Sequence, residues 1–167
     1  MDTGRALAMA SCRCALTIAA MLLACPATPS LAADPAWPAM QKIGMTGTWA
    51  SSCAGPPIVD NTFDTYYVEP GGRASYRSNR GEADGIANVT ILEARVMTPT
   101  TIRTLLRYDD PKWGHANGLS YDVVSEIVGG KRMRTLKSVG PDGKVLIDNG
   151  KLTANGQPIG SQEKCKD

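Results

Sequence analysis

Short runs of strand-forming residues recur along most of the chain, and turn residues separate them. From about residue 46 onward, the runs are rich in Thr, Val, Ile and Tyr, with Gly, Pro, Asn and Asp between them at short intervals. This pattern is typical of an all-β protein. We expect eight strands, at 46–52, 62–69, 73–78, 86–97, 100–108, 119–128, 131–138 and 144–152.

The links between the expected strands are mostly short. Turn residues occupy four of them, at Pro70-Gly71-Gly72, Pro99-Thr100, Gly129-Gly130 and Pro141-Asp142-Gly143. Strands joined by such turns pair antiparallel with their neighbours in sequence. About eight strands can close one barrel, so we predict a single small antiparallel up-and-down β-barrel over residues 46–167. A longer link at 109–118 is large enough to cover the mouth of this barrel.

The first 33 residues have the features of a secretory signal peptide. Arg5 and Arg13 give a positive start, residues 15–24 are apolar, and small residues end the segment at Ser30-Leu31-Ala32-Ala33. The apolar run is too short to span a membrane. We therefore expect cleavage near residue 33 and export to the periplasm. Residues 34–45 would form a loose lead-in with one helical turn near 39–43.

The leader also allows a second interpretation. The segment Leu22-Leu23-Ala24-Cys25 is similar to a lipobox, in which Cys25 would be acylated and would anchor the protein to a membrane. However, Pro26 directly follows the cysteine, and a cleavage site suited to a soluble protein lies a few residues later. These two features favour a soluble periplasmic protein over a membrane-anchored lipoprotein.

Only Cys53 and Cys165 remain once the leader is removed. In an oxidising periplasm we expect one intramolecular disulfide between them, although two free thiols or a bridge between molecules also fit the count. Leu, Ile, Val and Phe make up less than a fifth of residues 34–167, so the core is lean. A disulfide would help to stabilise such a domain.

The segment Gly47-Thr48-Trp49 resembles the opening strand of lipocalin-like barrels, in which a Gly-x-Trp motif places a tryptophan across the barrel floor. The later lipocalin motifs are missing. Ser120-Tyr121-Asp122 only faintly resembles the second, and no arginine after Arg134 is present to stack on the tryptophan. The resemblance implies a barrel in which Trp49 fills part of the core.

More widely, the chain is similar to a group of uncharacterised exported bacterial proteins, and this similarity implies no activity. It rests on Gly47-Thr48-Trp49-Ala50, Cys53, Pro56, Pro57, an Asp142-Gly143 hairpin and the terminal Cys165. Small periplasmic protease inhibitors with an eight-stranded barrel also begin with a similar strand and a nearby cysteine. Their disulfide is usually local, whereas the two cysteines here lie far apart in sequence.

The charge balance argues against nucleic acid as a partner. The whole chain has 18 Lys and Arg and 16 Asp and Glu. Arg5, Arg13 and Asp2 lie in the leader, so residues 34–167 have 16 basic and 15 acidic residues. Charges that nearly cancel create no field that gathers nucleic acid or an anionic membrane. A membrane would therefore be a partner only through acylation of Cys25.

Catalytic patterns are scarce. His115 is the only histidine, so a Ser-His-Asp or Cys-His arrangement would have to include it. Asp109 and Asp110 lie nearby, but with His115 they match no established metal-ligand spacing. We expect a protein that is not an enzyme and that uses no cofactor and no metal.

The expected strand at 131–138 carries charges on both of its faces. Lys131 and Lys137 fall on one parity and Arg132 and Arg134 on the other, so a regular strand would direct some of these cations inward. A buried arginine needs a carboxylate partner, and Arg132 or Arg134 would otherwise receive an anionic ligand. The alternative is a bulge or rim position that lets the side chains reach solvent.

Two functions are compatible with these features. The first is a binding barrel for a small apolar or anionic amphiphilic molecule, with Arg132, Arg134 and Trp113 as ligand-binding residues. The second is a protein-binding barrel, an inhibitor or envelope-stress factor, that uses the loop 109–118 with Trp113 as its anchor. An open barrel favours the first function. A filled core with an exposed Trp113 favours the second.

Overall fold

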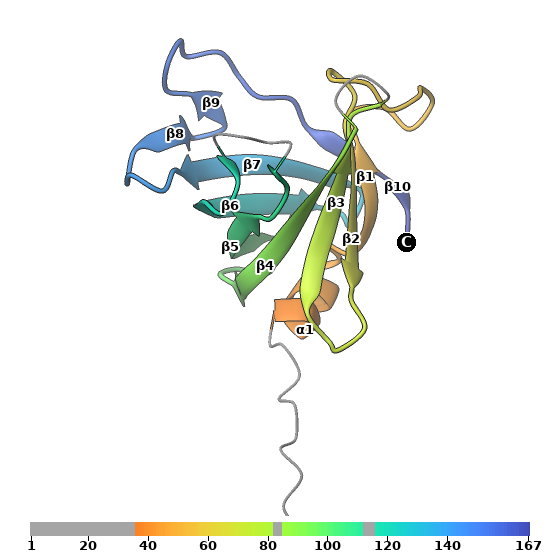
Figure 1. The fold of residues 1–167 in the computed structure, drawn as a ribbon. Helices are drawn as coiled ribbons and strands as arrows, with labels where there is room; N and C mark the ends of the chain where they lie inside the picture. The colour runs from red at the N-terminus through yellow and green to blue at the C-terminus, as the bar shows by residue number, and fades with distance from the viewer. Residues whose placement is uncertain (1–35, 82–84, 112–115) are drawn as a thin grey trace, which may run out of the picture. The chain divides into compact units, whose positions relative to one another are not determined.

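The computed structural model describes residues 36–81, 85–111 and 116–167. These residues form one short helix and ten strands (Figure 1). The elements are α1 (Ala36–Ile43), β1 (Gly47–Ala50), β2 (Phe63–Val68), β3 (Ala74–Asn79), β4 (Ile86–Val96), β5 (Thr101–Tyr108), β6 (Ser120–Val128), β7 (Arg132–Val139), β8 (Val145–Asp148), β9 (Lys151–Leu152) and β10 (Gln162–Lys166).

Eight of the strands close an antiparallel β-barrel, as the sequence predicts. Strands β1 to β7 pair in sequence order, and β10 pairs with β1 on one side and with β7 on the other. The closing contact joins Gln162 to Met133 and Glu163 to Arg132. A backbone hydrogen bond from the Lys164 N–H to the Lys131 carbonyl extends it.

The eighth barrel strand is not the predicted one. Residues 144–152, expected as a single strand, form the β8–β9 hairpin, which pairs with the C-terminal end of β7 outside the closed ring. Asn149 and Gly150 form its turn with φ values of 49° and 73°. An Asn-Gly pair is suited to two such left-handed positions, so the predicted strand is broken at its end. The strand that closes the barrel is β10.

Residues 36–45 are part of the folded unit, which corrects the expected loose lead-in. Helix α1 lies beneath the barrel in Figure 1 and packs on β4 and β5. Ala36 and Met40, four residues apart on one helix face, are completely buried. Met45 and Trp49 are buried beside them in the core cluster. The helix therefore closes one end of the barrel.

Trp49 occupies the interior, as expected. Its side chain is fully buried, and its Nε1–H donates to the Met45 carbonyl oxygen at 3.0 Å. The Nζ of Lys164 lies 5.7 Å from the ring centroid. The buried indole N–H thus has a partner, and the ring connects β1 to α1 and β10.

Gly47→Ala should destabilise the fold more than Gly72→Ala. The two glycines have nearly the same φ, +91° and +90°, so alanine carries a similar backbone strain of about 1–2 kcal/mol at each. Only at Gly47 would the added Cβ lie 2.2 Å from the Lys166 carbonyl oxygen, whereas the space at Gly72 is open. Urea denaturation should show the larger loss for Gly47→Ala. Equal losses would mean that the close approach of β10 to β1 has no energetic importance.

Candidate functional site

The barrel encloses a partly open cavity of about 360 Å³. Side chains of β2 to β7 form most of its wall, and residues of β8 and β10 and of the segments that flank β1 and precede β10 also line it. Its apolar wall includes Ile91, Leu106, Val123 and Met133. Ile91, Leu106 and Met133 also belong to the core cluster that contains Trp49, so the cavity adjoins the packed interior.

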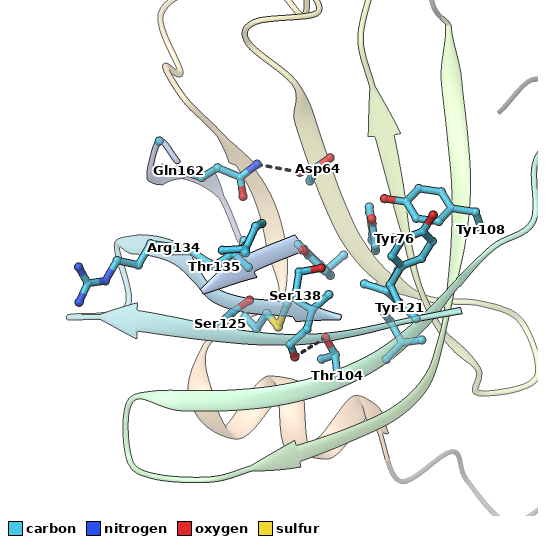
Figure 2. A pocket seen from close by; sticks show the side chains of 18 of the residues that line it. Asp64, Tyr76, Thr104, Tyr108, Tyr121, Ser125, Arg134, Thr135, Ser138 and Gln162 are labelled. Atoms are coloured by element: carbon cyan, nitrogen blue, oxygen red, sulfur yellow. Dashed lines mark hydrogen bonds between the residues drawn. The ribbon is translucent and has the colours of Figure 1, made fainter. Parts of the chain in front are cut away.

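Polar side chains also reach this cavity, because alternate residues of each strand point inward. Figure 2 shows them gathered from both sides of the barrel. The polar lining includes Asp64, Thr104, Ser125, Thr135, Ser138 and Gln162, together with the tyrosines described next. A purely structural core would be mostly aliphatic, so this interior is unusually polar.

Four tyrosines line the cavity in two ring pairs. Tyr66 and Tyr76 have ring centroids 5.0 Å apart with planes tilted by 37°, and Tyr108 and Tyr121 meet edge to face at 5.4 Å. Burial raises the pKa of Tyr66 and Tyr76 well above 10, and it also raises the pKa of Tyr108. A hydrogen bond joins the hydroxyls of Tyr76 and Tyr108. These three hydroxyls are therefore protonated at neutral pH.

Asp64 places a carboxyl group in the same cavity. The Nε2–H of Gln162 donates to its Oδ2 at 2.7 Å, which connects β10 to β2 (Figure 2). Its Oδ1 is buried and has no hydrogen-bond partner among the described residues. Burial raises the pKa of Asp64, against the lowering effects of hydrogen bonds from Gln162 and Ser78 and of the Arg80 charge. An unpaired oxygen of this kind is suited to a hydrogen-bond donor.

The stability of the fold should depend on pH through Asp64. The pKa of Asp64 in the folded chain is raised above its ordinary value of 3.8. At a pH between 3.8 and this raised pKa, the folded state therefore still holds a proton that the unfolded state has lost. The free energy of unfolding therefore falls as the pH rises from 3.8 through the raised pKa. Asp64→Asn should remove this fall.

Urea denaturation at a series of pH values measures the effect. Asp148→Asn, which removes an exposed carboxylate on β8, is the matched control and should keep the fall. A pH profile of Asp64→Asn that superimposes on that of the unchanged protein would contradict the prediction.

Arg132 and Arg134 are both exposed, so the structure shows the second of the two alternatives for this strand, a bulge that lets the side chains reach solvent, and neither arginine is directed inward. Met133, between them, is buried in the core. The Nε–H of Arg134 donates to Glu126 at 2.6 Å, and its side chain is 56% exposed. Figure 2 shows its guanidinium extending away from the other cavity residues. Neither arginine offers its charge to a ligand in the cavity.

A β-bulge resolves the mixed charge pattern of β7. Val124 pairs with Lys137 and the next residue, Ser125, pairs with Thr135, so Leu136 is the extra residue on β7. The bulge changes the parity between Arg134 and Lys137. Arginine and lysine of opposite parity can therefore both be exposed, as they are here.

Two further sequence predictions concern the loop 109–118. Trp113, predicted as a ligand-binding or anchor residue, and His115 lie outside the described residues. Asp109 accepts hydrogen bonds from the Thr90 hydroxyl and from Arg107, so it fastens the end of β5. In the part of the chain that the structure describes, no group of three His, Cys, Asp or Glu side chains could hold a metal.

The disulfide between Cys53 and Cys165 is present, as the sequence predicts. Their Cα atoms are 5.3 Å apart, across 112 residues of sequence. The Cys53 N–H also donates to Glu163 Oε1 at 2.8 Å. Together these contacts fasten the loop after β1 to β10, the strand that supplies Gln162 to the cavity.

Searches against protein-family models, curated proteins and solved structures find no match to this chain. Helix α1 has eight residues, and no helix in residues 36–81, 85–111 and 116–167 is long and apolar enough to cross a membrane.

Proposed function

We propose that this chain is an exported binding protein that holds a small amphiphilic molecule inside its β-barrel. The observation that carries this proposal is the cavity of about 360 Å³ lined by tyrosines and by Asp64. Its volume lies within the range of about 300–1,000 Å³ that is usual for ligand pockets. Apolar walls with a few converging polar groups are the usual composition of such sites.

The chemistry of the cavity changes the expected ligand. The sequence left open an apolar or an anionic amphiphilic ligand, and the anionic alternative depended on Arg132 and Arg134, whose side chains are both exposed. The other polar groups of the described lining are hydroxyls of tyrosine, serine and threonine, the Gln162 amide and the Asp64 carboxyl group. They support a ligand with hydrogen-bond donors and an apolar body.

The proposal includes export, which rests on the predicted leader and is compatible with the disulfide. Residues 1–33 and Cys25 lie outside the described residues. Expression of the full chain in a bacterium and intact-mass measurement should give a periplasmic protein that begins at Ala33 or Asp34. A product that begins at Cys25 and carries acyl mass would instead make it a membrane-anchored lipoprotein.

A fluorescent apolar probe, N-phenyl-1-naphthylamine, tests binding in the cavity. We expect its fluorescence to rise on binding, and we expect Ser125→Leu, which adds bulk to a buried cavity residue, to weaken binding at least about tenfold. Val124→Leu changes the neighbouring residue and leaves the cavity lining intact, so it should bind like the unchanged protein. Thermal unfolding checks that both variants are folded.

Mass spectrometry of molecules extracted from the natively purified protein complements the titration. A single small amphiphile recovered in stoichiometric amount would support the proposal. The proposal fails if nothing is extracted and the probe does not bind, or if both variants bind the probe equally well. The alternative function, protein binding through the loop 109–118, stays a hypothesis from the sequence.

A further inference from the structure

The cavity presents an acidic group, Asp64, to a ligand. Among the described residues that line it, only Asp64 and Arg134 carry charged side chains, and the Arg134 guanidinium is paired with Glu126 outside. Asp64 forms no ion pair with a described residue. Gln162, which donates to its Oδ2, is neutral.

Arg80 is the cation whose charge lowers the pKa of Asp64. It follows β3 and is not part of the cavity lining. Its charge is the weakest of the four influences on the pKa of Asp64, after burial and the hydrogen bonds from Gln162 and Ser78. Arg80 therefore acts on Asp64 from outside the cavity lining.

The tyrosines of the cavity offer ring faces and hydroxyl oxygens, both of which can bind a cation. Tyr66, Tyr76 and Tyr108 line the same cavity as Asp64, and Tyr66 lies two residues from it on β2, where it pairs with Tyr76 of β3. The face of a tyrosine ring attracts an ammonium group, most strongly where water is excluded. The hydroxyl oxygens can also accept N–H bonds. Because these hydroxyls stay protonated at neutral pH, they add no negative charge of their own.

On the basis of the proposed function, we infer that the molecule held in the cavity is a small organic cation, a primary amine with a short apolar body. Its ammonium group donates to the free Oδ1 of Asp64 after a small side-chain adjustment and contacts the rings of the tyrosines. Its apolar body packs on Leu106, Val123 and Met133.

Three probes that share one ring and differ in charge test this inference. They are 2-phenylethylamine, 2-phenylethanol and 3-phenylpropionate, titrated at pH 7 and followed by NMR chemical-shift changes. We expect the amine to bind at least about tenfold more tightly than the alcohol, and the carboxylate more weakly than both. This series uses the unchanged protein, so it decides the charge preference without any variant.

Asp64→Asn then tests the residue. It should weaken binding of 2-phenylethylamine at least about tenfold and change binding of 2-phenylethanol less than about twofold. Asp148→Asn removes one exposed negative charge from β8 and should change neither affinity. The two variants have the same net charge, so long-range attraction of the amine is matched.

The possible results separate this inference from the proposed function. The inference is overturned if 3-phenylpropionate binds as tightly as the amine, or if Asp64→Asn folds and keeps the affinity for the amine. In both cases the proposed function survives, because a small molecule still occupies the cavity. If none of the three probes binds, N-phenyl-1-naphthylamine does not bind and no molecule is extracted from the native protein, the proposed function fails, and the inference fails with it.

Discussion

Cys165→Ser should lower the free energy of unfolding by about 4–5 kcal/mol. The disulfide closes a loop of 112 residues, and in the chain-entropy model a loop of this length restricts the unfolded chain by nearly 5 kcal/mol. The bond also holds β10, whose pairing with β7 covers only Gln162 and Glu163. Loss of the bond therefore frees the strand that closes the barrel.

Urea denaturation of the oxidised protein and of the variants measures this effect. Cys53→Ser and the double variant Cys53→Ser/Cys165→Ser should lose the same free energy as Cys165→Ser, because each removes the same bond. A loss below about 1 kcal/mol would show that the entropy model does not describe this bridge. Different losses for the single and double variants would indicate a separate effect of the free thiol.

Trp49→Ala should cost about 3–5 kcal/mol, as is usual for removal of a buried tryptophan. The side chain is completely buried at the closed end of the barrel, where it meets the core residues of α1. The substitution leaves a cavity and an unpaired Met45 carbonyl oxygen.

Trp49→Phe separates the two contributions to this loss. It keeps most of the packing and removes the indole N–H, so it should cost less than alanine, with about 1 kcal/mol from the lost hydrogen bond. Thermal unfolding followed by circular dichroism ranks the variants. A Trp49→Ala protein as stable as the unchanged one would mean that α1 is not held by this ring.

The sequence predicted the parts of the barrel that depend on local patterns. Strands β1 to β7 lie close to their predicted ranges, because each is a strand-forming run bounded by Gly, Pro, Asn or Asp. The residues of β10, Gln162 to Lys166, show no apolar alternation. Their pairing comes from backbone hydrogen bonds and from the Cys53–Cys165 disulfide, which local patterns do not reveal.

The cavity residues were harder to predict. In β2, Phe63 is the most apolar candidate for the interior, but the opposite parity, with Asp64 and Tyr66, faces the cavity. The alternation of residues along a strand identifies its two faces. It does not show which face points into the barrel when the barrel interior is itself polar. The same ambiguity left the orientation of Arg132 and Arg134 open, because the pattern alone does not locate the bulge at Leu136 that exposes them both.

The β8–β9 hairpin gives the sheet an edge strand, although the closed ring of strands has none. An exposed edge strand can pair with an edge strand of another molecule and start aggregation. Here the outermost strand, β9, is only two residues long and includes Lys151, which forms a bridge to Pro158. A short strand, a lysine and a proline are features that oppose such pairing. The hairpin can thus extend from the barrel without recruiting a second chain into the sheet.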